Sequence, residues 1–146
     1  IGAGSFIAEI QQTSNITYRI YDFNRRDANG NLRELHTEQA KGAIDYSVEA
    51  DYRTRYEAVK DRPVELVACP YFTTTLYDLT RPCEIDLAAT DSFLVVMCIE
   101  GSGTLTDDQG SAMPLRQGET VLVPASAKSL SVSPQSSIKL LTSRID

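Results

Sequence analysis

The residues best suited to chemistry are arginines near the start of the chain, in and after the stretch ITYRIYDF at residues 16–23. A guanidinium group stabilises negative charge and forms paired hydrogen bonds with carboxylates and phosphates. If this stretch is a strand, Arg19 shares a face with Tyr21 and Phe23, where an unused charge is poorly accommodated. Arg19 is therefore a candidate functional residue, and a solvated strand arginine is the alternative. Arg25 lies at the start of a polar loop, where simple solvent exposure is the alternative.

The sequence offers few ligands for a metal ion. His36 is the only histidine, and a surface or helix-capping role is the simpler interpretation of it. The three cysteines, Cys69, Cys83 and Cys98, have no metal-ligand spacing and lie in β-rich apolar settings. Their odd number indicates reduced core thiols in a reducing compartment. We therefore expect no metal in this chain.

The first part of the chain is expected to contain a β-hairpin. Apolar and β-branched residues predict strands at 5–12 and 16–23, and the turn residues 13–15 would join them. In the second strand Asp22 would face away from Arg19, because side chains alternate along a strand.

A polar loop, a short helix and a linker are expected next. The loop spans residues 24–31, with Asn29-Gly30 at its tip. The helix spans residues 37–44, with Thr37 as its cap. Polar and aromatic residues 45–62 then connect to a second β unit.

Residues 63–146 read as a sandwich or jelly roll, because short strands recur every 8–12 residues between Gly and Pro signals. The almost continuously apolar run 93–100 predicts a buried strand, and Gly101-Ser102-Gly103 is expected to turn it. The strands expected are 64–69, 71–78, 83–87, 93–100, 104–106, 112–115, 120–123, 129–132 and 138–143.

Charge and composition exclude several classes of protein. The net charge is −6, and residues 1–62 carry nine Lys and Arg against ten Asp and Glu, whereas residues 63–146 carry five against ten. Neither half offers a broad basic face, so we expect no nucleic-acid partner. No apolar run approaches the roughly 20 residues of a membrane span, and no secretory signal is present. A cytoplasmic protein without a membrane partner is expected.

Residues 93–126 carry a first resemblance, through the phrases CIEGSG at 98–103 and QGETVLVPA at 117–125. They resemble the cupin barrel, in which a buried strand, a Gly-x-Gly turn and a Gly-Glu phrase follow one another. Metal-binding cupins place histidines in these motifs, and this stretch has none. The resemblance thus implies a metal-free, degenerate cupin.

Residues 7–36 carry a more specific resemblance, to the short bacterial form of the type I mannose-6-phosphate isomerases. The family pattern E-x-Q-Q-x-S-[DN]-x-T-Y-R-x-Y-D-[FYW]-x-R is matched from Glu9 to Arg25, with Asn15 where many relatives have Asp. The resemblance implies interconversion of mannose 6-phosphate and fructose 6-phosphate through an enediol. It also implies that Arg19 is the active-site arginine, that Arg25 contacts the substrate phosphate, and that Glu9 lies near the substrate.

The family's zinc lies in a first cupin, and its ligands would precede Ile1. We therefore expect a C-terminal piece with zinc only in the full-length enzyme. Residues 1–25 would be the last strands of the catalytic cupin, residues 26–62 a loop, helix and linker, and residues 63–146 the degenerate cupin. Such a chain would be inactive alone and would self-associate through its exposed N-terminal strands. The alternatives are a non-enzymatic cupin that binds a sugar or anion, and a purely structural or dimerisation domain.

Overall fold

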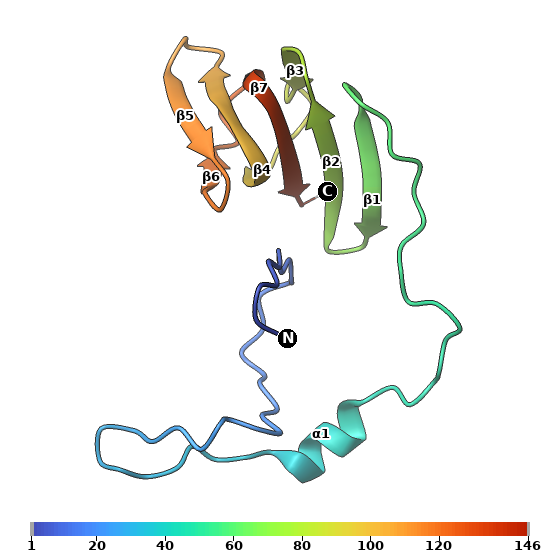
Figure 1. Ribbon diagram of the computed structural model, residues 1–146, viewed down its shortest axis with the longest axis vertical. Coiled ribbons are helices and arrows are strands. Elements are labelled where there is room, and N and C mark those ends of the chain that lie inside the picture. Colours follow the sequence, from blue (N-terminus) through green and yellow to red (C-terminus); the bar gives the residue numbers. More distant parts are fainter. Residues whose placement is uncertain (1, 146) are drawn as a thin grey trace. The chain divides into compact units, whose positions relative to one another are not determined.

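The computed structural model describes residues 2–145 of the chain, which form two compact units. The larger, the sheet unit, combines the residues up to Gln12 with those from Arg53 onward, and the smaller, the loop unit, is Thr13–Tyr52. Figure 1 shows that the sheet unit holds the strands and the loop unit holds the helix. No helix among the described residues is long and apolar enough to cross a membrane.

The strands confirm the mainly β class predicted from the sequence, and all their pairings are antiparallel. Burial alternates along the first parts of β4 and β7, which suits a sheet with one buried face. In chain order the strands are β1 (Pro63–Cys69), β2 (Phe72–Leu79), β3 (Cys83–Asp86), β4 (Leu94–Asp107), β5 (Ala112–Arg116), β6 (Thr120–Val123) and β7 (Ser129–Arg144).

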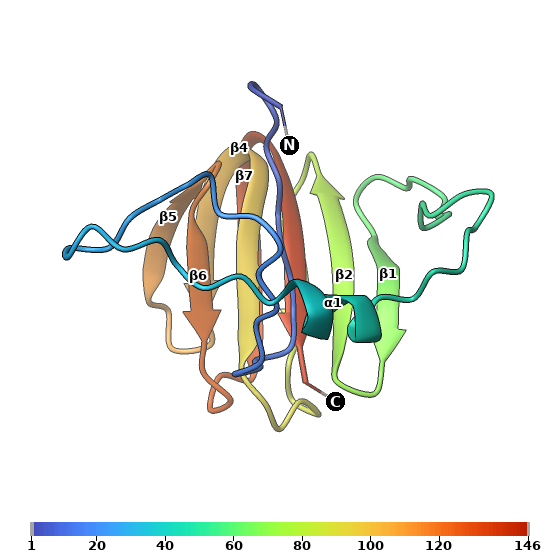
Figure 2. The ribbon, with the colours of Figure 1, turned by 90° about the horizontal axis from the view of Figure 1, so that it is seen from below.

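Two long strands, β4 and β7, form the centre of the sheet and pair with each other along most of their length. The other edge of β7 pairs with β2 through residues 138–144 and with β3 through residues 129–132. The other edge of β4 pairs with β6 near its start and with β5 near its end. Figures 1 and 2 both show β5, β4, β7, β2 and β1 in this lateral order.

The length of these two strands corrects the sequence prediction. Gly101-Ser102-Gly103 does not turn the chain but lies inside β4, and Pro134 does not divide β7. Register shifts between Cys98 and Glu100, and between Gly101 and Gly103, show that β4 bends by bulging instead of ending. Pro134 is accommodated opposite Gly103, next to this irregular region, where a proline disturbs the ladder least.

The glycines of β4 are required because β7 passes very close to them. Gly101 has a φ of +76°, and a Cβ atom built on it would lie 2.2 Å from the carbonyl oxygen of Ser137. A Cβ atom on Gly103 would lie 2.7 Å from the carbonyl oxygen of Ser133. The Gly-x-Gly phrase therefore serves close strand packing.

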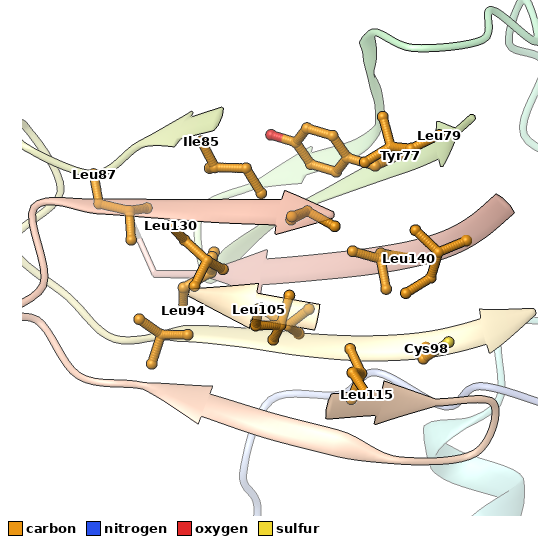
Figure 3. Packing of buried hydrophobic residues seen from close by; sticks show 14 of the residues in the cluster. Tyr77, Leu79, Ile85, Leu87, Leu94, Cys98, Leu105, Leu115, Leu130 and Leu140 are labelled. Carbon is orange, nitrogen blue, oxygen red and sulfur yellow. The ribbon is translucent and has the colours of Figure 1, made fainter. Parts of the chain in front are cut away.

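One hydrophobic core fills the inside of the sheet unit. Alternate residues of β4, Leu94, Val96 and Cys98, point into it, and Leu140 of β7 is fully buried there. Figure 3 shows Leu94, Cys98 and Leu140 among the side chains of this core, together with the ring of Tyr77. At about 25 cal/mol per Å² of buried apolar surface, such packing is the main stabilising term of the unit.

The predicted hairpin at residues 5–12 and 16–23 is wrong, because neither segment forms a strand. Two strands alone bury too little apolar surface to be stable. Here Phe6 is 60% exposed and Ile16 68% exposed, so neither segment has a buried apolar face. The loop unit contains instead an isolated bridge between Arg26 and Leu32.

The predicted short helix is confirmed as α1 (Thr37–Ala43), but its predicted cap is wrong. His36 occupies the N-cap position, and no side chain caps the helix. Only Ala40 is buried in it, so α1 presents a very narrow packed face.

Candidate functional site

The loop unit gathers three arginines around one buried carboxylate, Asp22, which is 6% exposed. Arg25 donates hydrogen bonds to Asp22 Oδ1 from Nε, at 3.0 Å, and from Nη2. Arg19 Nε lies 3.9 Å from the same oxygen, and Arg33 Nε lies 3.6 Å from Oδ2. We call these four residues the Asp22 cluster.

A tight turn folds Arg25 back onto Asp22. The amide of Arg25 donates to the carbonyl oxygen of Asp22 at 2.9 Å, and the two residues between them, Phe23 and Asn24, have φ values of 53° and 54°. Asn tolerates this left-handed conformation, whereas a bulky aromatic residue rarely adopts it. Phe23 is 75% exposed, so burial of its ring does not offset this strain. The strained turn nevertheless brings Arg25 to the carboxylate.

The loop unit has two arms: residues 19–25 form the first, and residues 33–36 form the second and run back alongside Arg19. The amide of His36 donates to the Arg19 carbonyl oxygen at 2.7 Å, and the Arg19 amide donates to His36 Nδ1 at 3.2 Å. Arg19 Nη1 also donates to the carbonyl oxygen of Glu34 at 3.1 Å. The Arg19 guanidinium is therefore held by the Glu34 carbonyl oxygen, and its side chain is only 19% exposed.

The polar loop between the two arms is closed by Asp27. The Asp27 carboxylate accepts hydrogen bonds from the amides of Asn29 and Asn31. The Gly30 amide donates to the main-chain carbonyl oxygen of Asp27. The predicted loop with Asn29-Gly30 near its tip is thus present. It carries the chain from Arg25 back to Arg33, which explains how these two residues reach the same carboxylate.

The arginines also determine the protonation of Asp22. Hydrogen bonds from Arg25 hold the pKa of the Asp22 carboxyl below its usual range, with smaller contributions from the charges of Arg25, Arg33 and Arg19, although burial opposes the shift. Three positive charges and one negative charge leave the cluster with a net charge of +2. Such a cluster is suited to binding an anion.

A depressed pKa predicts acid lability of the loop unit. Because the folded-state pKa of Asp22 lies below its unfolded value, its stabilisation is complete above the unfolded value, about 3.9, and is lost as pH falls through the folded value. Carboxyl ¹³C NMR should show Asp22 titrating below that value. Asp27 and Asp45 have depressed pKa values as well, so the Asp22→Asn variant is needed to isolate its contribution. Titration of Asp22 at or above the unfolded value would contradict this.

The structure brings together two of the three predicted site residues. Arg19 and Arg25 meet at Asp22, whereas Glu9 is an exposed residue of the sheet unit and its assignment stays a prediction. The sequence prediction missed Asp22 and Arg33. Strand alternation had put Asp22 on the face opposite Arg19, and Arg33 lies in a segment without periodicity.

Among residues 2–145, no group of three or more His, Cys, Asp or Glu side chains is arranged to hold a metal ion. The inside of the sheet is filled by aliphatic side chains, and Cys98 Sγ is directed to the carbonyl oxygens of Glu100 and Gly101. Burial raises the pKa of this thiol, which keeps it protonated.

A pocket of about 360 Å³ lies in the sheet unit. Its walls are mainly apolar, with Leu105, Met113 and Leu122 among them, and Asp107 and Asp108 contribute the charged groups. Pockets that bind small ligands have volumes of about 300 Å³ or more. Acidic groups repel anions, so this pocket is unsuited to a phosphate.

A family model described as "Mannose-6-phosphate isomerase, cupin domain" matches residues 64–144, from β1 to the end of β7. The chain belongs to the mannose-6-phosphate isomerase cupin-domain family. Mannose-6-phosphate isomerase ManA of Bacillus subtilis (strain 168) is 32% identical over 126 residues, which are 85% of this chain and 39% of that protein. Mannose-6-phosphate isomerase of Streptococcus mutans is 31% identical over 88% of this chain and 40% of its own length. The chain thus spans about two fifths of these mannose-6-phosphate isomerases.

One solved structure supports this family membership, and a second shows the same fold. The crystal structure of the mannose 6-phosphate isomerase from Bacillus subtilis has a TM-score of 0.65 and 28% identity, and the match covers 89% of this chain and 40% of that one. A cupin 2 conserved barrel domain protein from Leptotrichia buccalis has a TM-score of 0.51 at 21% identity, over 62% of this chain and 44% of that one. The cupin fold predicted from the Gly-x-Gly and Gly-Glu phrases is confirmed.

Proposed function

We propose that this chain acts as the C-terminal part of a mannose-6-phosphate isomerase, which interconverts mannose 6-phosphate and fructose 6-phosphate. The observation that carries the proposal is the match of relatives bearing that name to 85% and 88% of the chain. The cluster of arginines around Asp22 supports it, because the proposed substrates are phosphate esters.

Aldose–ketose isomerisation moves a proton between C1 and C2 of the sugar and develops negative charge on the adjoining oxygens. In this proposal Arg19 stabilises that charge. Its guanidinium is held in advance by the Glu34 carbonyl oxygen, and such preorganisation is what makes an electrostatic group effective. Arg25, whose side chain is 62% exposed, contacts the phosphate of the substrate. Glu9 is assigned near the substrate by family resemblance alone.

The zinc that the family resemblance implies would be held outside this chain. Here His36 Nδ1 accepts a hydrogen bond from the Arg19 amide, and the inside of the sheet is aliphatic. We therefore expect the isolated chain to bind no zinc and to be inactive, and we derive no catalytic step through the metal. The three free thiols suit the reducing cytoplasm, where we place the protein.

Exposed apolar side chains in the N-terminal residues support a role within a larger assembly. Phe6, Ile16, Ile20 and Phe23 are each at least 60% exposed. Large exposed apolar surfaces mark interaction sites. We propose that they pack against the rest of the isomerase, or against a second copy of this chain when the rest is missing.

A hybrid enzyme tests the proposal. This chain would replace the matched segment of Bacillus subtilis ManA, and the isomerisation of mannose 6-phosphate would be measured with zinc content by elemental analysis. We expect turnover within about tenfold of that of ManA, and no zinc or turnover in the isolated chain. A second hybrid, carrying the matched Streptococcus mutans segment, shows whether such exchanges are tolerated.

An inactive hybrid beside an active Streptococcus hybrid, with both folded by circular dichroism, would refute the proposal. Stoichiometric zinc or turnover in the isolated chain would refute the expectation that this chain binds no zinc and is inactive alone. The second candidate function is anion binding without catalysis, which the net charge of the Asp22 cluster also favours. It predicts phosphate binding by the chain together with an inactive hybrid.

A further inference from the structure

The arginines of the Asp22 cluster differ in how they are held. Arg19 donates from its guanidinium to the Glu34 carbonyl oxygen, and its side chain is largely covered. Arg25 is tied to Asp22 Oδ1 on one side, while its side chain remains 62% exposed. Arg33 is 45% exposed and faces Asp22 Oδ2 across 3.6 Å. The outer pair, Arg25 and Arg33, therefore presents guanidinium groups to solvent from two sides of the same carboxylate.

The contact between Arg33 and Asp22 is electrostatic only. Asp22 Oδ2 is buried and accepts no hydrogen bond from any described residue, which is uncommon for a buried oxygen. Ion pairing without a hydrogen bond keeps Arg33 near the carboxylate but leaves the donors of its guanidinium uncommitted to Asp22. Those donors suit an anion that arrives from solvent.

The charges match a phosphate ester. The cluster has a net charge of +2, and a phosphate monoester carries about −2 at neutral pH. Two planar guanidinium groups can each engage two phosphate oxygens. Without the central carboxylate, three like charges in one small loop would repel one another and separate.

We propose that Arg33 is a second phosphate-binding arginine beside Arg25, and that Asp22 is the positioning residue that holds both in place. The proposal rests on the proposed function for the identity of the substrate, a sugar phosphate. It adds two residues that the sequence motif did not assign. A simpler explanation is that Asp22 only fastens the two arms of the loop unit, and the two explanations predict different phosphate affinities.

Arg33→Gln is the direct test. Inorganic phosphate and mannose 6-phosphate would be titrated into the full chain, with ¹⁵N NMR of the arginine Nε–H groups as the readout. Loss of a charge-assisted hydrogen bond should weaken both ligands about tenfold or more for Arg33→Gln and for Arg25→Gln. Arg26→Gln is the matched control, because Arg26 donates to the Gly30 carbonyl oxygen and makes no ion pair with Asp22 among the described contacts. Unchanged affinity in Arg33→Gln would overturn the assignment of Arg33.

Asp22→Asn tests whether Asp22 positions the arginines, because the two explanations predict opposite changes in phosphate affinity. Removal of a negative charge beside an anion site should strengthen phosphate binding if charge alone matters. If Asp22 positions the arginines, binding weakens about tenfold instead, the Nε–H signal of Arg25 loses its protection, and Asp22→Glu restores part of the affinity. Stronger or unchanged binding in Asp22→Asn would overturn the positioning role. The Ala40 amide, which donates to the His36 carbonyl oxygen, reports whether the loop unit is folded. If Asp22→Asn unfolds this unit, the proposal is decided by Arg33→Gln.

These outcomes are separable from those of the hybrid enzyme. An active hybrid with an Arg33→Gln chain that binds phosphate normally refutes only this inference. An inactive hybrid with phosphate binding that depends on Arg33 refutes only the proposed isomerase function.

Discussion

Gly101→Ala should remove much of the stability of the sheet unit. The added methyl group would meet the Ser137 carbonyl oxygen of β7 at 2.2 Å, so one of the two central strands must move. The left-handed φ of +76° adds a conformational penalty. Together these effects should lower the free energy of unfolding by roughly 3 to 5 kcal/mol, out of the roughly 5 to 15 kcal/mol typical of a domain.

Gly110→Ala separates the two contributions. Gly110 has a similar φ, +81°, but nothing lies within 4 Å of its added Cβ atom. We expect this variant to lose only about 1 to 2 kcal/mol, the left-handed penalty alone. The chain has no tryptophan, so urea denaturation should be followed by circular dichroism. Equal destabilisation of the two variants would show that the close approach of β7 is unimportant.

Arg19→Ala in the hybrid enzyme should have the largest effect on activity. If Arg19 stabilises the negative charge of the enediol, its loss removes an interaction made mainly in the transition state. The turnover number should then fall about 100- to 1,000-fold, as it does when one preorganised donor is deleted, while KM changes little. Steady-state kinetics with mannose 6-phosphate measures both quantities.

Arg19→Lys and Arg26→Ala complete this test. Lysine keeps the charge but cannot reproduce the planar fork that reaches both Glu34 and the substrate, so it should recover only part of the turnover. Arg26→Ala should leave the turnover unchanged. A decrease below about threefold in Arg19→Ala, in a hybrid that folds, would place Arg19 outside the chemistry.

The sheet unit could be predicted from the sequence because its signals are local. Apolar segments and Gly or Pro signals located the strand-forming segments to within a few residues, although β4 and β7 were each predicted as two strands. The errors at Gly101–Gly103 and Pro134 share one cause. A glycine or proline ends a strand only where the hydrogen bonds to the neighbouring strand can also end. Here β4 and β7 stay paired past these residues, and the register shifts of a bulge accommodate them. That pairing joins segments far apart in the chain, so local patterns do not contain it.

The candidate site was predicted in part, for a different reason. The family pattern pointed to Arg19 and Arg25, whose side chains do meet. It gave no sign of Asp22 as the centre, because strand alternation separated Asp22 from Arg19. Residues 16–23 do not form a strand, so that alternation does not apply to them. The left-handed turn at Phe23 and Asn24, where a phenylalanine is an unexpected residue, then brings Arg25 back to Asp22. Arg33 depends on the whole loop returning the chain to Asp22, which no short motif encodes.

The central place of β7 has a consequence for how the protein folds. Its partners β2, β3 and β4 all precede it, so Thr73 must find Arg144 across most of the sheet unit. The hairpins β1–β2 and β4–β5 close short loops, whereas β7 must close long ones at a larger entropic cost. Sheets dominated by such distant pairings fold in about milliseconds to seconds. Until β7 docks, the edges of β2, β3 and β4 stay open to other chains, so this step sets how long the nascent protein is exposed to aggregation.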